Sequence, residues 1–445
     1  MKKLIFFLIL FVFGFGLSAQ TLLTPVNPEV LGHGNATTAL PKPMMSFYYN
    51  PAGFALENDF VISPINLWLF TDTATLQLLS NPEQAASDIE SNLADSNIDQ
   101  DIADWLNSKS DAELAQIVSD AGYTEADIIA AGGPEPFFDS LTTDEKIAII
   151  GLVLEQPDAP VTADQLGLPS GAFRAGANLG VGLTAGGLGL GTFITLDADL
   201  GGNNILVAEG SATAQFTVPV GYAMDFDLGL AKVYVGAQLR PFINFYAPVD
   251  NQFIASLVAS DGTFIGQLMN TPAQREFGLA IDAGAIVDIW WFNFGVSLFD
   301  AFNRTWYDSG TLGDYFNDPN FEPTPGEAFV VDPTLNFGTA FNPQIPVISG
   351  IIDPTLYADF NDLGGMISAI QARDTEAIAE MVSVGLDARI LNFINARAGY
   401  SNGYYALGAG LDLWFLEFDV ATTFNAIETE NISDFGVSFE ARLHF

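Results

Sequence analysis

The 445-residue chain contains no cysteine and only two histidines, His33 and His444. Disulfide bonds, thiolate metal sites and thiol nucleophiles are therefore excluded. A Ser–His–Asp triad would need one of the two histidines, and neither stands in a catalytic motif. The glycine-rich runs lack the Lys-Ser/Thr pair that completes a phosphate-binding loop. The sequence predicts a protein that is not an enzyme and uses no cofactor and no metal.

Charge is scarce and mostly of one sign. Charged residues make up 15% of the chain, against about 25% in average proteins. There are 14 lysines and arginines and 54 aspartates and glutamates, which gives a formal net charge of −40. Such a surface repels nucleic acid, so no nucleic-acid partner is expected. Carboxylate oxygens suit Ca²⁺, but the acids Asp197, Asp199, Asp308, Asp314 and Asp318 show no EF-hand spacing.

Long apolar runs are absent beyond residue 17. Lys2 and Lys3 precede an apolar run from Leu4 to Leu17, which Ser18 and Ala19 follow. This order predicts a secretory signal peptide, residues 1–19. A membrane helix needs about 20 apolar residues, so the first run is too short for an anchor. A helical membrane protein is therefore not expected.

Apolar residues and glycine dominate what remains. The chain is 49% hydrophobic, with 37 Phe and 42 Gly. In lipid every backbone N–H and C=O group needs a partner, and only helices and closed β-barrels provide one. An exported apolar chain without membrane helices therefore predicts a β-barrel in the bacterial cell outer membrane, with outer-membrane lipid as its surroundings.

The C-terminal residues show the two-residue period of a barrel wall. One face is apolar and consists of Phe435, Val437, Phe439, Ala441, Leu443 and Phe445. The other face is small or polar and consists of Gly436, Ser438, Glu440, Arg442 and His444. Charged groups need water or mutual pairing. We therefore expect Glu440, Arg442 and His444 to face the lumen, together with Glu417 and Asp419 of the preceding segment.

Similar alternation recurs in fourteen segments. They lie near 59–70, 172–185, 188–200, 211–224, 229–245, 275–288, 291–301, 328–340, 351–362, 381–392, 393–401, 403–414, 415–424 and 433–445. The even number suits a single-chain bacterial barrel. The predicted fold is an all-β transmembrane protein: a 14-stranded antiparallel outer-membrane β-barrel formed by residues 57–445.

The connections between these segments alternate between long and short, as expected for external loops and periplasmic turns. Residues 71–171 form the largest external insertion, and helical spacing of apolar residues predicts a mainly helical, acidic cap there. Asn81-Pro82-Glu83 resembles a helix start, and 302–327 is expected to be another external loop. Trp290, Trp291 and Trp414 fall at periplasmic turns, where indole rings suit the membrane interface.

Residues 20–56 fit neither a strand nor a long helix. They contain the segment Gly32-His33-Gly34 and the turn Asn50-Pro51-Ala52-Gly53. In that turn Pro51 fixes φ, Gly53 permits a positive φ, and Asn50 can bond its own backbone. Such a turn would lead the chain from the lumen into the wall.

The turn Asn50-Pro51-Ala52, the preceding Gly32-His33-Gly34 segment and the fourteen strands together resemble the FadL-type family of outer-membrane long-chain fatty-acid transporters. The resemblance implies that residues 20–56 form an N-terminal hatch inside the barrel. It also implies passive uptake of hydrophobic small molecules such as long-chain fatty acids, gated by the hatch. In that family a kinked strand opens the wall sideways, and Gly186-Gly187 and Gly201-Gly202 flank the third strand here.

Two alternatives remain open at this point. FadL-like barrels also include scaffolds or shuttles for secreted or conjugation proteins, and the acidic insertion favours a secreted or periplasmic protein partner. A general porin would conduct ions. By resemblance to other outer-membrane barrels, the last strand should dock on the barrel-assembly machinery, with Phe439, Leu443 and Phe445 as the membrane-insertion signal.

Overall fold

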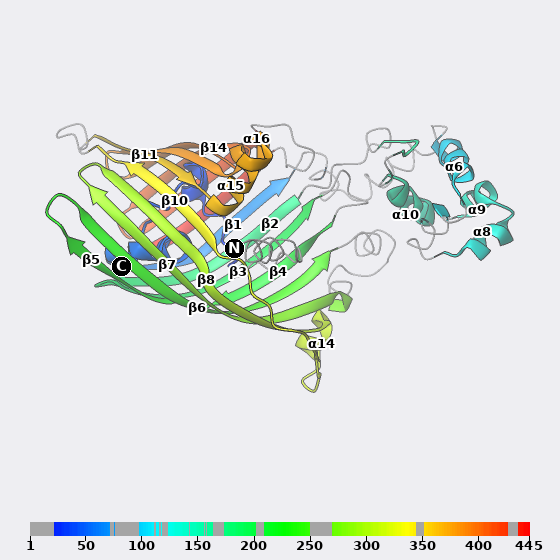
Figure 1. Cartoon of the computed structure of the whole chain (residues 1–445), viewed down its shortest axis with the longest axis horizontal. Helices are drawn as coiled ribbons and strands as arrows, with labels where there is room; N and C mark the ends of the chain where they lie inside the picture. The colour runs from blue at the N-terminus through cyan, green and yellow to red at the C-terminus, as the bar shows by residue number, and fades with distance from the viewer. Residues whose placement is uncertain are drawn as a thin grey trace, which may run out of the picture.

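The computed structural model shows a barrel of long tilted strands with a helical unit beyond one end (Figure 1). It describes residues 22–71, 75, 98–110, 113–114, 117, 123–141, 143–154, 156, 158–162, 173–201, 209–249, 269–343, 351–425 and 435–445.

The wall begins with six strands that end at Val249. They are β1 (Asp59–Thr71), β2 (Phe173–Ala185), β3 (Leu188–Gly201), β4 (Glu209–Thr217), β5 (Val220–Asp227) and β6 (Lys232–Val249). Two long strands and a two-residue strand follow: β7 (Pro272–Ile289), β8 (Phe292–Thr311) and β9 (Thr324–Pro325). The remaining strands are β10 (Thr334–Phe341), β11 (Ile352–Phe360), β12 (Val382–Ile390), β13 (Ile394–Ser401), β14 (Tyr404–Leu413), β15 (Leu416–Asn425) and β16 (Phe435–His444).

Antiparallel pairing closes these strands into a ring. Each strand pairs with its neighbour in the chain, β16 pairs with β1, and β8 pairs with β10. β4 and β5 both lie between β3 and β6, so they are two parts of one wall strand. β9 only extends the edge of β8. Within the described residues the wall therefore has fourteen strands, and the predicted fourteen-stranded antiparallel barrel is confirmed.

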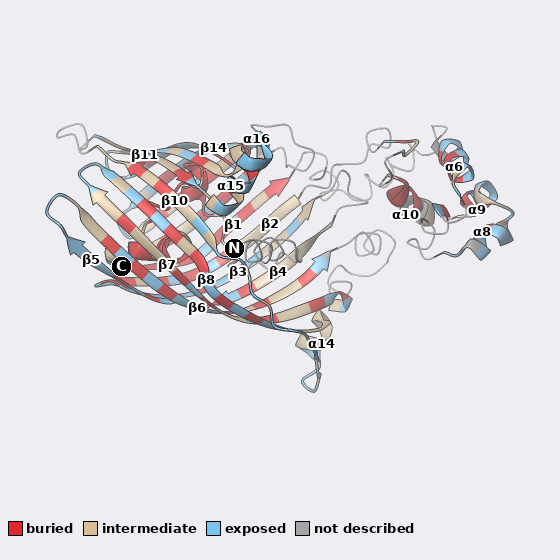
Figure 2. Ribbon diagram, in the orientation of Figure 1, coloured by how far each residue is buried: buried red, intermediate tan, exposed pale blue. Residues whose placement is uncertain are grey.

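Burial alternates along each strand with the expected period of two (Figure 2). On β3, Ile194 and Leu196 are 44% and 49% exposed on the outside, while Thr195 between them is 1% exposed on the inside. An outer surface of large apolar side chains around a polar interior suits lipid outside and polar contacts inside. The protein is a transmembrane barrel of the bacterial outer membrane. Among the described residues, no helix is long and apolar enough to span a membrane.

β8 corrects one expectation from the sequence. The segment 302–327 was expected to be an external loop, but β8 continues to Thr311 and pairs with β7 as far as Pro272. A bulge hides this continuation, because Asp300 has a φ of 54° and the register shifts opposite Ile281–Ala283. The bulge inserts two extra residues into β8, so Phe299 and Asp300 are both buried and Ala301 and Phe302 are both exposed, and the alternation appears to stop at residue 301.

The helical unit contains α6 (Ile98–Ser108), α8 (Glu125–Ala131), α9 (Pro134–Ser140) and α10 (Thr143–Leu154). Its apolar side chains form a core of their own around Ile102, Phe138 and Ile149, all of which are inaccessible to solvent. The predicted helix start at Asn81-Pro82-Glu83 lies outside the described residues. Three further helices occupy other loops: α14 (Leu312–Asn317), α15 (Leu363–Ala372) and α16 (Thr375–Glu380).

Residues 22–57 lie inside the barrel, and we call them the luminal segment. It contains α2 (Pro28–Gly32), α3 (Ser46–Tyr49) and the 3₁₀ helix η1 (Pro51–Ala55). α2 contacts β13 to β16, whereas η1 contacts β5, β6 and β7. The segment therefore crosses the lumen and touches opposite parts of the wall.

Candidate functional site

The luminal segment contains three short helical turns, and side chains cap two of them, α2 and η1. The Asn27 side chain accepts hydrogen bonds from the backbone N–H groups of Glu29 and Val30 at the start of α2. Asn50 caps η1 in the same way by accepting from the N–H of Ala52. Pro28 and Pro51 occupy first helical positions, where a missing N–H costs nothing. Local capping thus shapes a segment that is too short to form stable helices alone.

Gly53 does not have the positive φ that was expected of it. It lies within η1, and the need for glycine there is steric. A Cβ atom at this position would lie 2.2 Å from Oγ of Ser46 and 2.6 Å from Cγ of Pro41. The turn is therefore specified by close packing of the luminal segment on itself and not by a left-handed backbone.

A buried ionic network holds α2 to the C-terminal strands. Glu29 lies 2.6 Å from Arg442 of β16 and 3.6 Å from Arg397 of β13. Arg442 also lies 2.7 Å from Asp419 of β15, and Arg397 forms an ion pair with the same carboxylate. We call these residues, with Lys42 and Glu417, the ionic clamp.

Lys42 brings a second charge of the luminal segment into this network. Its Nζ lies 2.5 Å from Glu29 and 3.3 Å from Glu417. Burial disfavours the ionised form of Glu29, but the positive charges of Lys42, Arg442 and Arg397 outweigh burial and hold the pKa of Glu29 below its ordinary value. The same carboxylates raise the pKa of Lys42 against the effect of its burial. Both groups are therefore charged at neutral pH.

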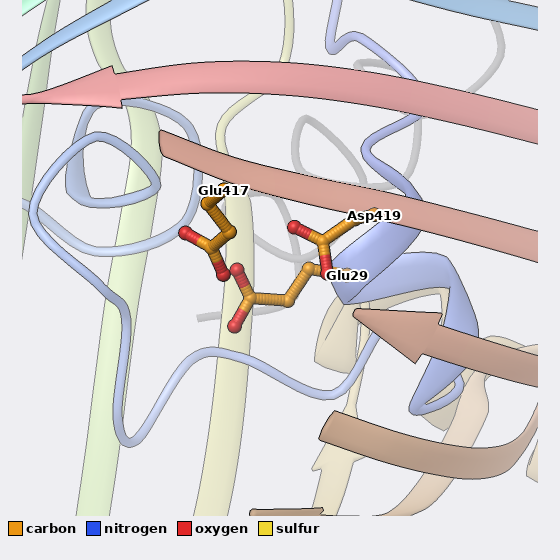
Figure 3. A group of neighbouring side chains, drawn as sticks. All are labelled: Glu29, Glu417 and Asp419. Carbon is orange, nitrogen blue, oxygen red and sulfur yellow. The ribbon is translucent and has the colours of Figure 1, made fainter. Parts of the chain in front are cut away.

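Three carboxylates of the clamp point toward one another (Figure 3). Glu29 comes from α2, and Glu417 and Asp419 come from β15. Their ligand oxygens lie within 4.8 Å of one another, which is close enough to hold a cation. However, Arg442 contacts all three, so the chain's own side chains already balance much of this negative charge.

Two further contacts fix the middle of the luminal segment. The Asp359 carboxylate of β11 accepts hydrogen bonds from the backbone N–H groups of Thr37 and Thr38 at 2.8 and 2.7 Å. His33 stacks on Tyr357 with ring centroids 4.6 Å apart. Burial lowers the pKa of His33 to about 4, so the ring is neutral at neutral pH.

Wall glycines let the luminal segment approach the barrel closely. A Cβ atom at Gly385 of β12 would lie 1.8 Å from the carbonyl oxygen of His33. One at Gly236 of β6 would lie 2.4 Å from the carbonyl oxygen of Pro51, and one at Gly295 of β8 would lie 2.3 Å from that of Thr38. Part of the chain's high glycine content is thus explained by backbone contacts in the lumen.

The other half of the luminal segment makes apolar contacts. Phe47, Tyr48 and Phe54 pack with Phe193 of β3, and we call these four residues the aromatic cluster. The ring centroid of Phe193 lies 5.3 Å from that of Phe47 and 5.1 Å from that of Tyr48. Asn50 beside them donates its side-chain N–H groups to the carbonyl oxygens of Thr38, Ala285 and Val296.

The wall is interrupted next to the aromatic cluster. β4 ends at Thr217 and β5 begins at Val220, because Pro219 has no N–H to donate to a neighbouring strand. Pro241 of β6 lies beside this break and accepts from the N–H of Val218 at 3.2 Å. Gly186 and Gly187, which flank the third strand, form the tight β2–β3 turn, with φ values of 57° and 83°. Gly202 lies outside the described residues.

A hollow of about 260 Å³ lies at this break, and we call it the wall notch. It is lined by Val181 and Leu183 of β2, Leu190 to Thr192 of β3, and Val218 to Val220. Val181, Leu190 and Val220 are each 38–44% exposed on the lipid-facing side. The notch is therefore apolar and opens toward the membrane.

A second, polar pocket of about 390 Å³ lies at the turn end of the barrel. Lys42, Glu57, Asp59, Glu417 and His444 are among its lining residues. His444 lies between Asp59 and Glu417, at 2.8 and 3.0 Å. Its charged walls suit water and ions and not an apolar ligand.

The structure brings most of the sequence-selected residues together. Gly32, His33 and Gly34 lie against β12 to β14, and Asn50 to Gly53 lie against β6 and β7. Glu440, Arg442, Glu417 and Asp419 are all buried in the lumen around α2. Phe439, Leu443 and Phe445 lie on the other face of the last strand, where Phe445 is 70% exposed.

Several important residues were not selected from the sequence. Arg397, Lys42 and Asp359 contact the luminal segment across long sequence separations, so no local pattern reveals them. The sequence around Phe193 does not distinguish it from other aromatic residues in the strands. Pro219 did carry a signal, because a proline inside the predicted strand 211–224 marks an edge or an interruption.

No family model matches this chain, and no curated protein resembles it in sequence. The similar solved structures include the toluene transporter TodX of Pseudomonas putida, with 9% identity, coverage of 95% of this chain and 99% of that one, and a TM-score of 0.41. The toluene transporter TbuX of Ralstonia pickettii has 10% identity, coverage of 96% and 100%, and a TM-score of 0.45.

The monoaromatic hydrocarbon channel CymD has 10% identity, coverage of 95% and 98%, and a TM-score of 0.43. The strand pairing of this chain itself closes fourteen strands into a ring. The chain is a fourteen-stranded outer-membrane β-barrel whose own N-terminal residues fill part of its lumen.

Proposed function

We propose that this barrel lets hydrophobic small molecules, including long-chain fatty acids, cross the outer membrane passively. The wall notch is the observation that carries the proposal. It is an apolar hollow open to lipid, and an aromatic cluster lies directly behind it in the lumen. Apolar solutes gain free energy by moving along such surfaces instead of through water.

The luminal segment acts as the hatch in this proposal. It crosses the lumen and is buried along most of its length. Movement of its apolar half, Met44 to Ala55, would connect the lumen with the wall notch. The ionic clamp would meanwhile keep the other half in place, because separating buried charges is costly.

Uptake by the purified full-length protein in liposomes tests this function. Labelled oleate and labelled toluene are the probes, the second because it is the cargo named for TodX and TbuX. We expect saturable uptake of at least one probe and little ion conductance. Ion conductance without apolar uptake would instead support a general porin and would overturn the proposal.

Asn50→Ala tests the role of the hatch. The variant loses side-chain hydrogen bonds to the carbonyl oxygens of Thr38, Ala285 and Val296 and should loosen the apolar half. We expect faster uptake with unchanged barrel folding. Asn320→Ala, at an exposed position after α14, is the control that should leave uptake unchanged. Equal rates for the wild type and Asn50→Ala would argue against a moving hatch.

The helical unit favours a second candidate function, a scaffold or shuttle for secreted or conjugation proteins. Its independent core around Ile102, Phe138 and Ile149 gives it the means to fold as a separate binding module. Pull-down with the full-length barrel, with and without residues 98–161, distinguishes the two functions. A partner that is lost with the unit, together with absent uptake, would favour the scaffold.

We also propose that the barrel-assembly machinery recognises the last strand. Phe445 donates its N–H to the carbonyl oxygen of Phe60 at the seam that closes the ring. Phe445→Asp should reduce the amount of inserted barrel, measured by surface protease protection. Phe415→Asp, at a nearby turn, is the matched control. Normal insertion of Phe445→Asp would contradict this proposal.

A further inference from the structure

Arg304 is a cation on the lipid-facing side of the wall. It lies on β8 between Phe302 and Trp306, which are 56% and 49% exposed on the outer face. Asn303 and Thr305, its neighbours in the chain, are buried on the luminal face. Because side chains alternate along a strand, Arg304 is directed outward, among the side chains that contact lipid.

The positions opposite Arg304 on both neighbouring segments are apolar. Leu279 of β7 stands directly opposite it in the register. On the other side, the bridge between Thr305 and Phe329 places Val330, which is 71% exposed, opposite Arg304. The guanidinium therefore projects from an apolar outer surface.

Arg304 also differs from nearby cations in having no ion pair. Arg275, on the same outer face of β7, lies 2.6 Å from Asp308. Lys232, at the periplasmic end of β6, has a carboxylate at 2.9 Å. Among the residues that the structure describes, no carboxylate lies within 4 Å of Arg304, and this includes Asp332 on the segment beside it. A charge on an apolar surface is favourable only if an anion or water compensates it.

The register places Arg304 at the external edge of the apolar band. β7 and β8 run side by side from the turn at Trp290 to α14 (Figure 1). Leu279, opposite Arg304, stands ten positions from Ile289, the last residue of β7 before that turn. With a rise of about 3.3 Å per residue and a tilt of about 40°, ten positions span about 25 Å across the membrane. The apolar band of such barrels is also about 25 Å tall, so the guanidinium lies at the headgroups of the external leaflet.

Trp306 fixes the guanidinium at this level. Cζ of Arg304 lies 5.5 Å from the ring centroid of Trp306, which is within the range of a cation–π contact. Indole rings favour the membrane interface, and a planar guanidinium can donate two parallel hydrogen bonds to one phosphate. Because the ring already restricts the long side chain, less conformational entropy is lost when an anion binds.

We propose that Arg304 and Trp306 form an outer-surface site for the phosphate of an anionic lipid of the external leaflet, of the lipopolysaccharide class. Phe302 and Leu279, on the membrane side of the guanidinium, would contact the acyl chains of the same lipid. Charge complementarity supports this occupant, because the chain as a whole carries a net charge of −40 and repels an anionic leaflet elsewhere. The inference does not depend on the proposed function, because the site lies outside the lumen.

Binding of fluorescent lipopolysaccharide to the purified full-length barrel in detergent micelles tests the site. EDTA is included so that divalent cations cannot bridge lipid phosphates to the acidic loops. We expect Arg304→Gln to weaken binding about tenfold, which corresponds to about 1.4 kcal/mol. Arg304→Lys keeps the charge but loses the paired donors, so it should weaken binding less. Arg304 is exposed, so neither variant removes a buried contact; circular dichroism checks that both barrels fold.

Lys232→Gln is the matched control. Lys232 is also an exposed cation of this side of the wall, but it lies at the periplasmic end and is paired with Asp225. The control should bind lipopolysaccharide as tightly as the wild type. Equal weakening by Arg304→Gln and Lys232→Gln would mean that only the overall charge matters and would overturn the site. Unchanged binding by Arg304→Gln would overturn it as well.

Two further measurements identify the group that Arg304 binds. Lipopolysaccharide without its phosphates should bind the wild type and Arg304→Gln equally, and a remaining difference would contradict a phosphate contact. An excess of inorganic phosphate should not displace the lipid from the wild type, because the apolar contacts would be missing. Displacement by inorganic phosphate would instead indicate a site for a free anion and would reject the lipid.

Discussion

The luminal segment contacts two different parts of the barrel wall. On the side of β12 to β16 it is held by buried charges, with Glu29 and Lys42 set among Arg397, Arg442 and Glu417. On the side of β2 to β7 it is held mainly by aromatic rings packed against glycines. Ion pairs in a buried site are directional and costly to break, whereas apolar contacts can slide. The two halves are therefore held by different kinds of contact, and in the proposed function the first half is the anchor and the second half is the part that moves.

The largest effect is expected from Arg442→Ala. Arg442 is 1% exposed and contacts Glu29, Glu417 and Asp419, so its removal leaves buried carboxylates without their main partner. We expect a loss of about 3–5 kcal/mol in the free energy of unfolding. Urea unfolding in detergent micelles, followed by circular dichroism, measures it. A loss below 1 kcal/mol would show that the clamp is not an anchor.

His33 should make the free energy of unfolding depend on pH, on the same side of the barrel. Its folded pKa is lowered by burial to about 4 from an ordinary 6.5, so the unfolded chain binds a proton first as the pH falls. The contribution of neutral His33 is fully present above pH 6.5 and is lost as the pH falls toward 4. The difference between the folded and the unfolded pKa of His33 corresponds to about 3 kcal/mol.

His33→Gln should therefore unfold with a flatter pH dependence than the wild type between pH 6.5 and 4. Urea unfolding at several pH values gives the comparison, and the difference between the two proteins isolates His33 from Glu29 and Asp387 beside it. Below pH 4.5 the lowered pKa of Glu29 should add a further loss of stability in both proteins. If the free energies of unfolding of the two proteins change with pH in parallel above pH 4.5, the lowered pKa of His33 is refuted.

A pair of glycine variants compares the two parts of the wall directly, one on β12 and one on β2. In Gly385→Ala the new methyl group would meet the backbone oxygen of His33 at 1.8 Å, whereas in Gly182→Ala it would meet the ring of Phe47 at 3.2 Å. A backbone carbonyl cannot give way easily, but the Phe47 side chain needs to shift by only a few tenths of an ångström. We expect a loss of about 1–3 kcal/mol for the first and clearly less for the second. Equal losses would remove the distinction between the walls.

The smallest effect is expected outside the lumen. Lys232 and Asp225 form an ion pair at 2.9 Å near the β5–β6 turn, with side chains 41% and 52% exposed. Exposed pairs contribute about 0–1 kcal/mol. Lys232→Ala should therefore leave the unfolding midpoint almost unchanged and serves as the reference for Arg442→Ala. A large loss would mean that charge in general, and not burial, stabilises this barrel.

The local pattern predicted the wall well but missed its irregularities. Alternation along Phe435 to Phe445 follows directly from lipid on one side and polar contacts on the other, so it can be read without a structure. The bulge at Asp300 interrupts the alternation locally and therefore hid ten residues of β8. The break at Pro219 was visible as a proline, but its meaning depended on Pro241 and Gly191, which come from other strands.

Gly53 is a single residue whose role the local sequence pattern also failed to predict. A glycine after a proline suggests a positive φ, yet the requirement here is space beside Ser46 and Pro41. Steric demands of this kind arise between residues that meet only after folding. They leave no periodic signal in the chain.

By itself, the sequence determined the number of strands and the alternation of inward and outward side chains along most of them, because two-residue alternation and turn chemistry are local properties. The tertiary structure alone decided which charges contact the luminal segment and which rings pack against it. Glu29 and Arg442 are 413 positions apart, and Tyr48 and Phe193 also come from distant parts of the chain. Only closure of the barrel brings them together, since their contacts depend on the register of the whole ring.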